Sequence, residues 1–427
     1  MLENPPKIKI GDFIILQRQK YMKLHKFGNI ESSAALGKDQ LELRNIEGHP
    51  YCSTFKMIPK ETRGRQRITA LELCSDKDMQ DIRDIMNNAE SGADNRNIKD
   101  DGGSQKLGNE EILKLREDIG DSKKIIGTLV ENSTSFQSKT VYSQEKYLKR
   151  KEKKYFEYVQ IRQPSIRMLA EIFYRQDPDK IMGLRIDSLS QIISYSDVNA
   201  FGKFLLFESG TNGLLPAAFL NAIGSGTKGK LVHMHPGNVP QKQAIQALNL
   251  PQEQLDRCVS VNIYSVLREF YQGKEEEKAN VEEETEESAA KRPKLEEGEN
   301  NTDEKSKSDE KVKPDEKSQK WKLENKKACD LMKEKFDSLI VVSRDHPLNI
   351  VKELLQFIKP GRPVIVFNLS KELLMEMYVE LKMLSTVTNL HLTSNWMRYY
   401  QILPNRTHPE VQMSGNSGYI LRGTSIN

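Results

Sequence analysis

The first 92 residues alternate apolar and polar positions over short runs that glycine and proline separate. Strand patterns occur at Asp12–Leu16, Gln40–Arg44 and Tyr51–Ile58, and Pro59 is expected to end the last of them. Alternation with a period of two, bounded by turn residues, is typical of half-buried strands. Residues 1–92 are therefore predicted to form a β-rich, barrel-like or sandwich domain.

Residues 93–163 change to helical spacing. Capping residues precede three helix patterns, at Asn109, Asp121 and Ser143, and the last helix is expected to continue through Val159. Pro164 then marks a boundary, and Ser165 can cap a helix over 166–174. We interpret residues 93–163 as a helical connector.

From Phe201 onward, strand and helix patterns alternate, which predicts an α/β domain with a mostly parallel, doubly wound sheet over residues 164–427. The expected strands are 204–207, 230–234, 259–263, 338–342, 363–367, 389–403 and 419–422, and helices are expected at 214–223, 241–248, 348–358 and 371–384. The last two strand patterns follow each other without a helix, which suits an antiparallel edge.

Residues 273 to about 320 interrupt this alternation with a charged segment. It holds 17 acidic and 11 basic residues, and its only aliphatic residues larger than alanine are Val281, Leu295 and Val312. Such a segment cannot bury enough surface to offset its ordering entropy, so we expect a disordered insert. Within it, Ala290–Leu295 is a compact basic cluster, either a nuclear import signal or a chance cluster in a Lys-rich linker.

Charge is distributed unevenly along the chain. The whole sequence carries +4, whereas the residues outside the insert, with 54 basic and 44 acidic side chains, carry +10. A body this basic favours a polyanionic partner, with nucleic acid first.

The remaining composition narrows the class of protein. A length of 427 residues allows two or three domains. No run approaches the roughly 20 apolar residues of a membrane span, and the four cysteines have no paired spacing, so we expect a soluble intracellular protein with free thiols and no metal site.

A glycine turn follows the first strand of the α/β region, at Glu208-Ser-Gly-Thr-Asn-Gly-Leu214. The order of strand, glycine turn and helix is how an α/β sheet cradles a nucleotide-like cofactor. An intact turn would read Glu-x-Gly-x-Gly-x-Gly, and here Asn212 and Leu214 occupy two glycine places. Glu208, Gly210 and Gly213 remain, as a functional loop or, the interpretation that we favour, as a retained turn in a site that no longer binds cofactor.

The end of the strand expected at 230–234 also indicates a site that no longer binds cofactor. An intact site has an acidic residue there for the ribose hydroxyls, and this chain has His233-Met-His235. Two histidines on one strand face suggest metal, but no third ligand is near in sequence, so a structural role is favoured.

The fourth strand is followed by Ser343-Arg-Asp-His-Pro347, where an enzyme methylating a base nitrogen has an acidic or amide residue before proline. Arg344 is a poor acceptor for a base amino group and a good phosphate donor. Asp345 is a candidate for chemistry there, and the plainer interpretation, a turn with an exposed arginine, is favoured.

The helix expected from Ser143 is the main candidate for binding RNA. Its basic residues Lys146, Lys149, Arg150, Lys153 and Lys154 share one broad face, which can follow a phosphate backbone. Its aromatic residues either stack on bases or pack on the body, and we favour packing. Secondary basic candidates are Arg18, Lys20, Lys23, Lys26, Arg344, Arg398 and Arg406.

Several motifs outside these patterns resemble those of one family. They are Asp94–Ile98, Asp100–Gly102, Ser104–Leu107, Glu131–Phe136, the Lys-rich segment 143–158, Gln163–Arg167, Trp396–Pro404, Arg406–Pro409 and Met413–Tyr419. Together they are similar to the non-catalytic subunits of the eukaryotic tRNA adenine-N1 methyltransferase, over nearly the whole chain except the charged insert.

This resemblance implies an N-terminal barrel-like domain and a C-terminal Rossmann-like, methyltransferase-type domain. It also implies a nuclear complex, a heterotetramer of two plus two subunits, which methylates N1 of the T-loop adenine at tRNA position 58. The paralogous catalytic subunit holds S-adenosylmethionine, this chain binds none, and both subunits bind tRNA. Two alternatives stay open: a self-sufficient methyltransferase with an atypical cofactor loop, and an RNA-binding scaffold without a methyltransferase partner.

Overall fold

The computed structural model divides the chain into two compact units. Unit 1 contains residues 1–168 and 247–249, and unit 2 contains the remaining residues. The structure describes residues 5–63, 66–74, 105–108, 111–112, 122–140, 143–144, 146–148, 150–151, 158–272, 316–402, 407–411, 413 and 415–426. The division into three parts with boundaries at 92/93 and 163/164 stays a prediction.

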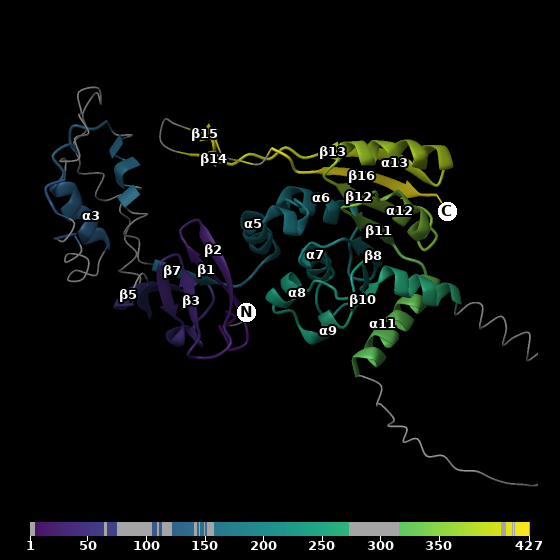
Figure 1. The fold of residues 1–427 in the computed structure, drawn as a ribbon, viewed down its shortest axis with the longest axis horizontal. Helices are drawn as coiled ribbons and strands as arrows, with labels where there is room; N and C mark the ends of the chain where they lie inside the picture. The colour runs from purple at the N-terminus through teal and green to yellow at the C-terminus, as the bar shows by residue number, and fades with distance from the viewer. Residues whose placement is uncertain are drawn as a thin grey trace, which may run out of the picture. The chain divides into compact units, whose positions relative to one another are not determined.

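Unit 1 contains a seven-stranded sheet in its described residues, with the order β2-β1-β7-β5-β6-β4-β3 (Figure 1). Its strands are β1 Phe13–Arg18, β2 Tyr21–Lys26, β3 Ser33–Leu36, β4 Asp39–Glu42, β5 Thr54–Arg63, β6 Gln66–Leu73 and β7 Tyr158–Arg162. The sheet curls so far that its two edge strands, β2 and β3, come close together. Lys23 Nζ on β2 donates a hydrogen bond to the Ala35 carbonyl on β3 at 2.6 Å. The apolar residues that it encloses form one core, which includes Ile14, Phe27 and Phe55. The prediction of a barrel-like domain is confirmed.

Two local expectations for unit 1 were wrong. Strand β5 does not end at Pro59, because a register shift between Pro59 and Glu61 lets it continue to Arg63. Such an irregularity is where a strand tolerates a residue without an amide hydrogen. The helix from Ser143 does not continue through Val159, because Tyr158–Arg162 forms β7 and lies between β1 and β5.

Between β6 and β7, the described residues form a small helical cluster. Helix α3, Ser122–Glu131, begins directly after the expected cap Asp121. It buries Ile125, Ile126 and Leu129 against Phe136 and Leu148. This cluster has its own small core, separate from the core enclosed by the sheet.

Unit 2 contains a seven-stranded sheet in its described residues, in the order β10-β9-β8-β11-β12-β16-β13. Its strands are β8 Lys203–Glu208, β9 Lys230–His235, β10 Cys258–Asn262, β11 Ser338–Val342, β12 Pro363–Asn368, β13 Val387–Ser394 and β16 Tyr419–Ser425. The first five are parallel, and β16 and β13 complete an antiparallel edge, as predicted. The strand expected at 389–403 is shorter, since β13 ends at Ser394.

Helices cover both faces of this sheet, which explains the continuous apolar runs in its strands. On β8, Phe204 packs against Phe219 of α7, whereas Leu205 and Phe207 face a core shared with α11, α12 and α13. The helices are α5 Ile166–Gln176, α6 Ile186–Tyr195, α7 Leu214–Ile223, α8 Gln243–Ala247, α9 Gln252–Leu255, α11 Glu316–Lys333, α12 Leu348–Leu355 and α13 Lys371–Leu384. Ser165 caps α5 as expected, since its Oγ accepts from Met168 N at 3.4 Å.

The charged insert lies mostly outside the described residues. Helix α11 begins at Glu316, before the limit of about 320 expected for the insert. Among the described residues, no helix is long and apolar enough to cross a lipid bilayer.

Candidate functional site

The glycine turn lies at the carboxyl edge of β8, beside the point where the strand order reverses between β8 and β11. In open α/β sheets, this crevice is where ligands bind. The turn is tight, with positive φ angles at Gly210 (127°), Asn212 (55°) and Gly213 (74°), and α7 begins at the next residue. Asparagine tolerates the left-handed region better than most residues, so the turn forms despite the lost glycine.

The glycines of the turn allow another group to approach their backbone closely, and in this structure that group is the segment around Gln241 of the same chain. Asn212 N donates to Gln241 Oε1 at 2.7 Å, and Ala244 N donates to Asn212 O at 3.0 Å. A Cβ at Gly213 would lie 2.6 Å from the Gln241 carbonyl oxygen, and a Cβ at Gly210 would lie 3.2 Å from its side-chain amide nitrogen. The segment after β9 therefore packs where the turn would otherwise face a cofactor.

Glu208, the last residue of β8, is buried, and its carboxylate is used internally. The Thr211 hydroxyl donates to Oε2, and His233 Nε2 lies 3.1 Å from Oε1. On the other side of the ring, His233 Nδ1 lies 3.3 Å from Ser260 Oγ. The ring can donate a hydrogen bond from Nε2 to the Glu208 carboxylate and accept one from the Ser260 hydroxyl at Nδ1, which gives each of these groups a partner. Among the described residues, the partners of the Glu208 carboxylate are thus side chains.

His235 ends β9, at the place where an intact site has its ribose carboxylate. Its Nδ1 donates to the Gly237 carbonyl at 2.7 Å, and its ring centroid lies 5.7 Å from that of His233. Burial lowers the pKa of His235 to about 4, and the neighbouring His233 adds to the shift. Within the described part of the chain, no three His, Cys, Asp or Glu side chains form a group suited to a metal ion.

These contacts fit a nucleotide-like cofactor poorly. The turn glycines face Gln241, the Glu208 carboxylate is paired, and a neutral histidine stands in the ribose position. The chain's own side chains thus satisfy the polar groups that a cofactor would need at this edge.

The segment after β11 is also tied to its surroundings. The Ser343 carbonyl accepts from Asn368 Nδ2 at 2.8 Å, and Arg344 Nη2 donates to the Asp179 carbonyl at 2.5 Å. Asp345 is exposed. Arg344 thus lies at the carboxyl edge of the sheet, with one guanidinium nitrogen already bonded to backbone.

The basic residues predicted to bind RNA are only partly described. Lys146 and Arg150 are exposed, whereas Lys149, Lys153 and Lys154 lie outside the described residues. Tyr147 packs edge-on against Phe136 at 5.5 Å between centroids, the role favoured for the aromatic residues of this segment.

The secondary basic candidates differ in how they are held. Arg18 pairs with the buried Asp39 at 2.8 Å, Lys23 bonds to β3, and Lys26 lies over the Phe13 ring. Lys20 is exposed and Arg406 lies outside the described residues.

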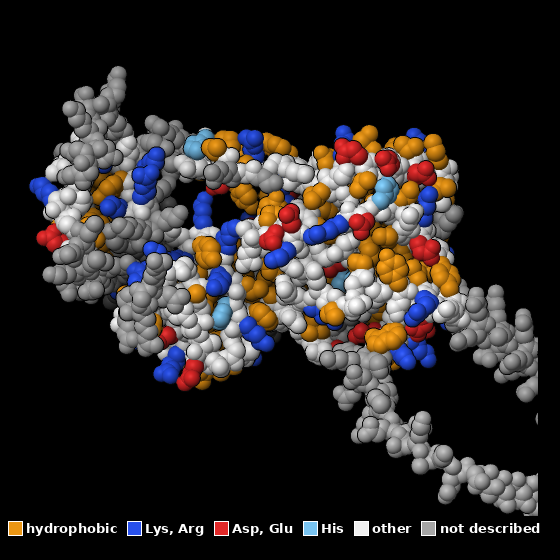
Figure 2. Space-filling view, in the orientation of Figure 1, with side chains coloured by type: hydrophobic (Ala, Val, Ile, Leu, Met, Phe, Trp, Pro, Cys, Tyr) orange, Lys and Arg blue, Asp and Glu red, His pale blue; other side chains and the backbone are white. Residues whose placement is uncertain are grey.

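Sequence reasoning missed an exposed apolar arm in unit 2. We define the arm as the described residues between β13 and β16, which are 395–402, 407–411, 413 and 415–418 and include the short strands β14 Tyr400–Gln401 and β15 His408–Pro409. Trp396, Ile402 and Val411 are 73%, 79% and 92% exposed, and Figure 2 shows hydrophobic side chains along the arm. Arg398 lies over the Trp396 ring at 5.3 Å. The run of aromatic residues from 396 to 400 was the available signal.

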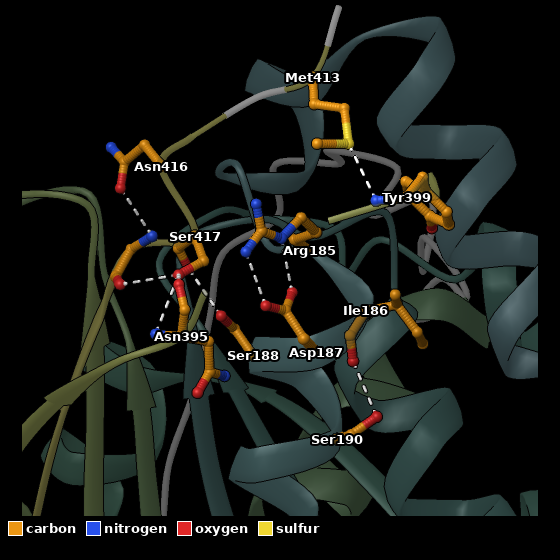
Figure 3. Close-up of polar contacts among 11 residues, drawn as sticks. Arg185, Ile186, Asp187, Ser188, Ser190, Asn395, Tyr399, Met413, Asn416 and Ser417 are labelled. Carbon is orange, nitrogen blue, oxygen red and sulfur yellow. Dashed lines mark hydrogen bonds and ion pairs between the residues drawn. The ribbon is translucent and has the colours of Figure 1, made fainter. Parts of the chain in front are cut away.

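The base of the arm is fixed by buried polar contacts (Figure 3). Ser417 Oγ donates to the Asn395 carbonyl at 2.7 Å, and Ser188 Oγ on α6 donates to the Ser417 carbonyl at 2.6 Å. Beside them, Arg185 and Asp187 form a two-pronged ion pair with both distances at 2.7 Å. The two ends of the arm are thereby held together and tied to α6, while its apolar side chains face solvent.

The sheet order and the glycine turn define a Rossmann-like domain of the methyltransferase type. In sequence comparisons, the Gcd10p family matches residues 7–322, and the chain belongs to this family. It is 31% identical to the tRNA (adenine(58)-N(1))-methyltransferase non-catalytic subunit TRM6 of Mus musculus, over 97% of this chain and 88% of the relative. The corresponding subunit of Dictyostelium discoideum is 30% identical, over 98% and 79%.

Two solved structures have a similar arrangement at low sequence identity. The tRNA (m1A58) methyltransferase TrmI from Aquifex aeolicus matches with a TM-score of 0.46 and 9% identity, over 99% of this chain and all of the other. A SAM-dependent O-methyltransferase from Thermotoga maritima matches with a TM-score of 0.46 and 11% identity, over 99% and 95%.

Proposed function

We propose that this chain is the non-catalytic, tRNA-binding subunit of a tRNA (adenine-N1)-methyltransferase that modifies the T-loop adenine at tRNA position 58. A separate, paralogous subunit binds S-adenosylmethionine and carries out the methyl transfer. Family membership supports the role, and the observation that carries it is the glycine turn packed against Gln241 of the same chain.

The same contacts argue against S-adenosylmethionine as a cofactor of this chain. A bound methyl donor would have to displace Gln241 from Asn212. Its ribose hydroxyls would also lack a carboxylate partner, because β9 ends in His235, whose pKa is lowered. Charge-assisted hydrogen bonds contribute about 1.5–3 kcal/mol each, so the loss of two weakens binding roughly a hundred- to ten-thousand-fold.

The arm supports the association with a catalytic subunit. Contiguous exposed apolar side chains are characteristic of surfaces that a partner covers, and aromatic residues are enriched in interface cores. The polar base at Ser417 fixes where the arm leaves the sheet, so less conformational freedom is lost when a partner binds. We extend the proposal to a heterotetramer of two plus two subunits.

The decisive experiment compares the two subunits alone and together. The chain is purified alone, the catalytic subunit alone, and both after co-expression, and each sample is assayed for methyl transfer to a tRNA transcript and for S-adenosylmethionine binding by calorimetry. We expect activity in the co-expressed sample only and one donor bound per pair. Methyl transfer by this chain alone, or a micromolar donor affinity, would favour a self-sufficient methyltransferase.

Nuclear localisation is part of the proposal. The basic cluster Ala290–Leu295 lies outside the described residues and is proposed as the import signal. Exchanging Lys291, Arg292 and Lys294 for glutamine should move a fluorescent fusion to the cytoplasm, and unchanged nuclear accumulation would rule the cluster out.

A further inference from the structure

Tyr147 is the centre of a basic cluster in the helical part of unit 1. Its ring packs edge-on against the buried Phe136, and its hydroxyl lies 3.4 Å from Gln105 Oε1. The neighbouring Leu148 is buried in the same small core. The tyrosine is thus fixed at both ends, and its ring is a rigid part of the surface.

Two lysines converge on this ring. Lys139 Nζ lies 5.0 Å from the ring centroid and Lys151 Nζ lies 5.2 Å from it. Cation–π attraction contributes about 0.5–1 kcal/mol at exposed sites, enough to hold each ammonium close to the ring. Two like charges are thereby brought into one small area.

Two further cations extend this area along the same segment. Lys146 and Arg150 are exposed and four residues apart, so they are neighbours on one helix face. Among the described residues, no carboxylate lies within ion-pair distance of Lys139, Lys146 or Arg150. Figure 2 shows Lys and Arg side chains on the visible face around α3. The like charges of Lys139, Lys146 and Arg150 repel one another, and a bound polyanion reduces this repulsion.

The surroundings of the cluster favour nucleic acid over protein. No large hydrophobic side chain is exposed among the described residues between 105 and 151, in contrast to the arm. Protein interfaces need an apolar core, whereas interfaces with nucleic acids are polar and positively charged. The Tyr147 ring already contacts Phe136 and two ammonium groups, which leaves it poorly placed to stack on a base.

We propose that Lys139, Lys146, Arg150 and Lys151 form a site for the phosphate backbone of tRNA, with Tyr147 as the platform that positions two of them. The inference rests on the proposed function and specifies where this chain holds the substrate. The site reads backbone charge and not base identity, because phosphate contacts set position and base contacts set sequence preference.

The test measures how salt affects tRNA binding by the co-purified complex. Affinity for a fluorescent tRNA transcript is measured at several salt concentrations for the wild type and two double variants, Lys146→Gln/Arg150→Gln and Lys139→Gln/Lys151→Gln. Each lost phosphate contact should make the slope of log K against log salt shallower by about 0.9, or about 0.7 for a single-stranded contact. We expect each double variant to bind roughly tenfold more weakly near physiological salt.

Matched controls separate local charge from net charge and from folding. Lys228→Gln/Lys230→Gln removes the same charge from exposed lysines at the amino edge of β9 and should keep the wild-type slope. Lys146→Arg/Arg150→Lys keeps the charge and should keep the affinity, and Tyr147→Phe keeps the platform and should do the same. Thermal unfolding of every variant confirms that the fold persists.

Three results would overturn the inference in distinguishable ways. A wild-type complex without tRNA affinity contradicts both the site and the proposed function. Wild-type binding with unchanged slopes in both double variants contradicts the site alone. Variants that lose the catalytic subunit but keep the wild-type slope would instead assign the cluster to a protein contact.

Discussion

The carboxyl edge of β8 and the arm between β13 and β16 both adjoin the seven-stranded sheet of unit 2, yet the edge pairs its polar groups within the chain whereas the arm leaves apolar side chains exposed. At the edge, Glu208 and the turn amides find partners within the chain. On the arm, Trp396 and Val411 are left largely exposed. The edge is part of the folded interior, whereas the arm presents exposed apolar side chains, which we propose as the surface for the catalytic subunit. Substitutions at the edge should therefore affect stability, and substitutions on the arm should affect assembly.

The largest effect is expected at Gly213. An alanine there has a Cβ 2.6 Å from the Gln241 carbonyl oxygen and a positive φ of 74°, so Gly213→Ala should lower the free energy of unfolding by about 3 kcal/mol. Chemical denaturation of the full chain measures it. The control is Gly226→Ala, where φ is 67° and nothing lies within 4 Å, with an expected loss of about 1 kcal/mol. Equal losses at both glycines would contradict the close packing of Gln241.

The arm should give the reverse result. Trp396→Ala should leave the unfolding free energy within about 0.5 kcal/mol of the wild type, because the side chain is 73% exposed. Association with the catalytic subunit should weaken by about 2 kcal/mol, or roughly thirtyfold, as for an aromatic residue at an interface centre. Phe201→Ala, at a 74% exposed aromatic residue outside the arm, is the control. A pull-down titration in which both variants bind alike would remove the arm from the interface.

The next effect is a pH dependence at the edge. Because the pKa of His235 is lowered to about 4 in the folded chain and lies near 6.5 when unfolded, the unfolded state binds more protons between these values. The stabilisation is complete above about pH 6.5 and is lost as the pH falls, by about 2 kcal/mol at pH 5. His235→Gln should flatten the stability profile in this window, whereas a variant of the exposed His391 should leave it unchanged. A profile equally steep without His235 would assign the proton uptake to other groups.

The smallest effect is expected at Gln241. Its side-chain oxygen accepts one hydrogen bond from Asn212 N, so Gln241→Ala should cost about 1 kcal/mol of stability. The variant should still fail to bind S-adenosylmethionine in calorimetry, because the backbone of residue 241 and the His235 end of β9 remain. Donor binding gained by this variant would show that one side chain alone closes the edge.

The sheet of unit 2 could be predicted because its central strands are buried on both faces. Runs such as Phe204–Phe207 and Ser338–Val342 are almost wholly apolar, and their short length and their β-branched and aromatic residues favour buried strands over helices. Strands β2 and β3 of unit 1 were missed for the opposite reason. Tyr21–Lys26 carries charges at several positions, and its place in the sheet depends on pairing with β1.

The cofactor-binding residues that the candidate site lacks could be predicted from the sequence. The internal contacts that take their place could not. The missing glycines and the missing ribose carboxylate are visible in the sequence. The contacts of Gln241 with Asn212 and of His233 with Glu208 join residues 29 and 25 positions apart. Such contacts depend on how loops close over the sheet edge, which local patterns do not specify.

Strand β7 has a consequence for how the chain is made. It lies between β1 and β5, although more than 80 residues separate it from the end of β6 at Leu73. The ribosome must therefore synthesise the chain as far as Arg162 before the sheet of unit 1 can complete its hydrogen bonding. Until then, the edges of β1 and β5 that pair with β7 have no partner strand. Nascent chains released before this point should be exposed to chaperones and to proteases, and a protease cut between β6 and β7 in the finished protein should leave two pieces held together by the sheet.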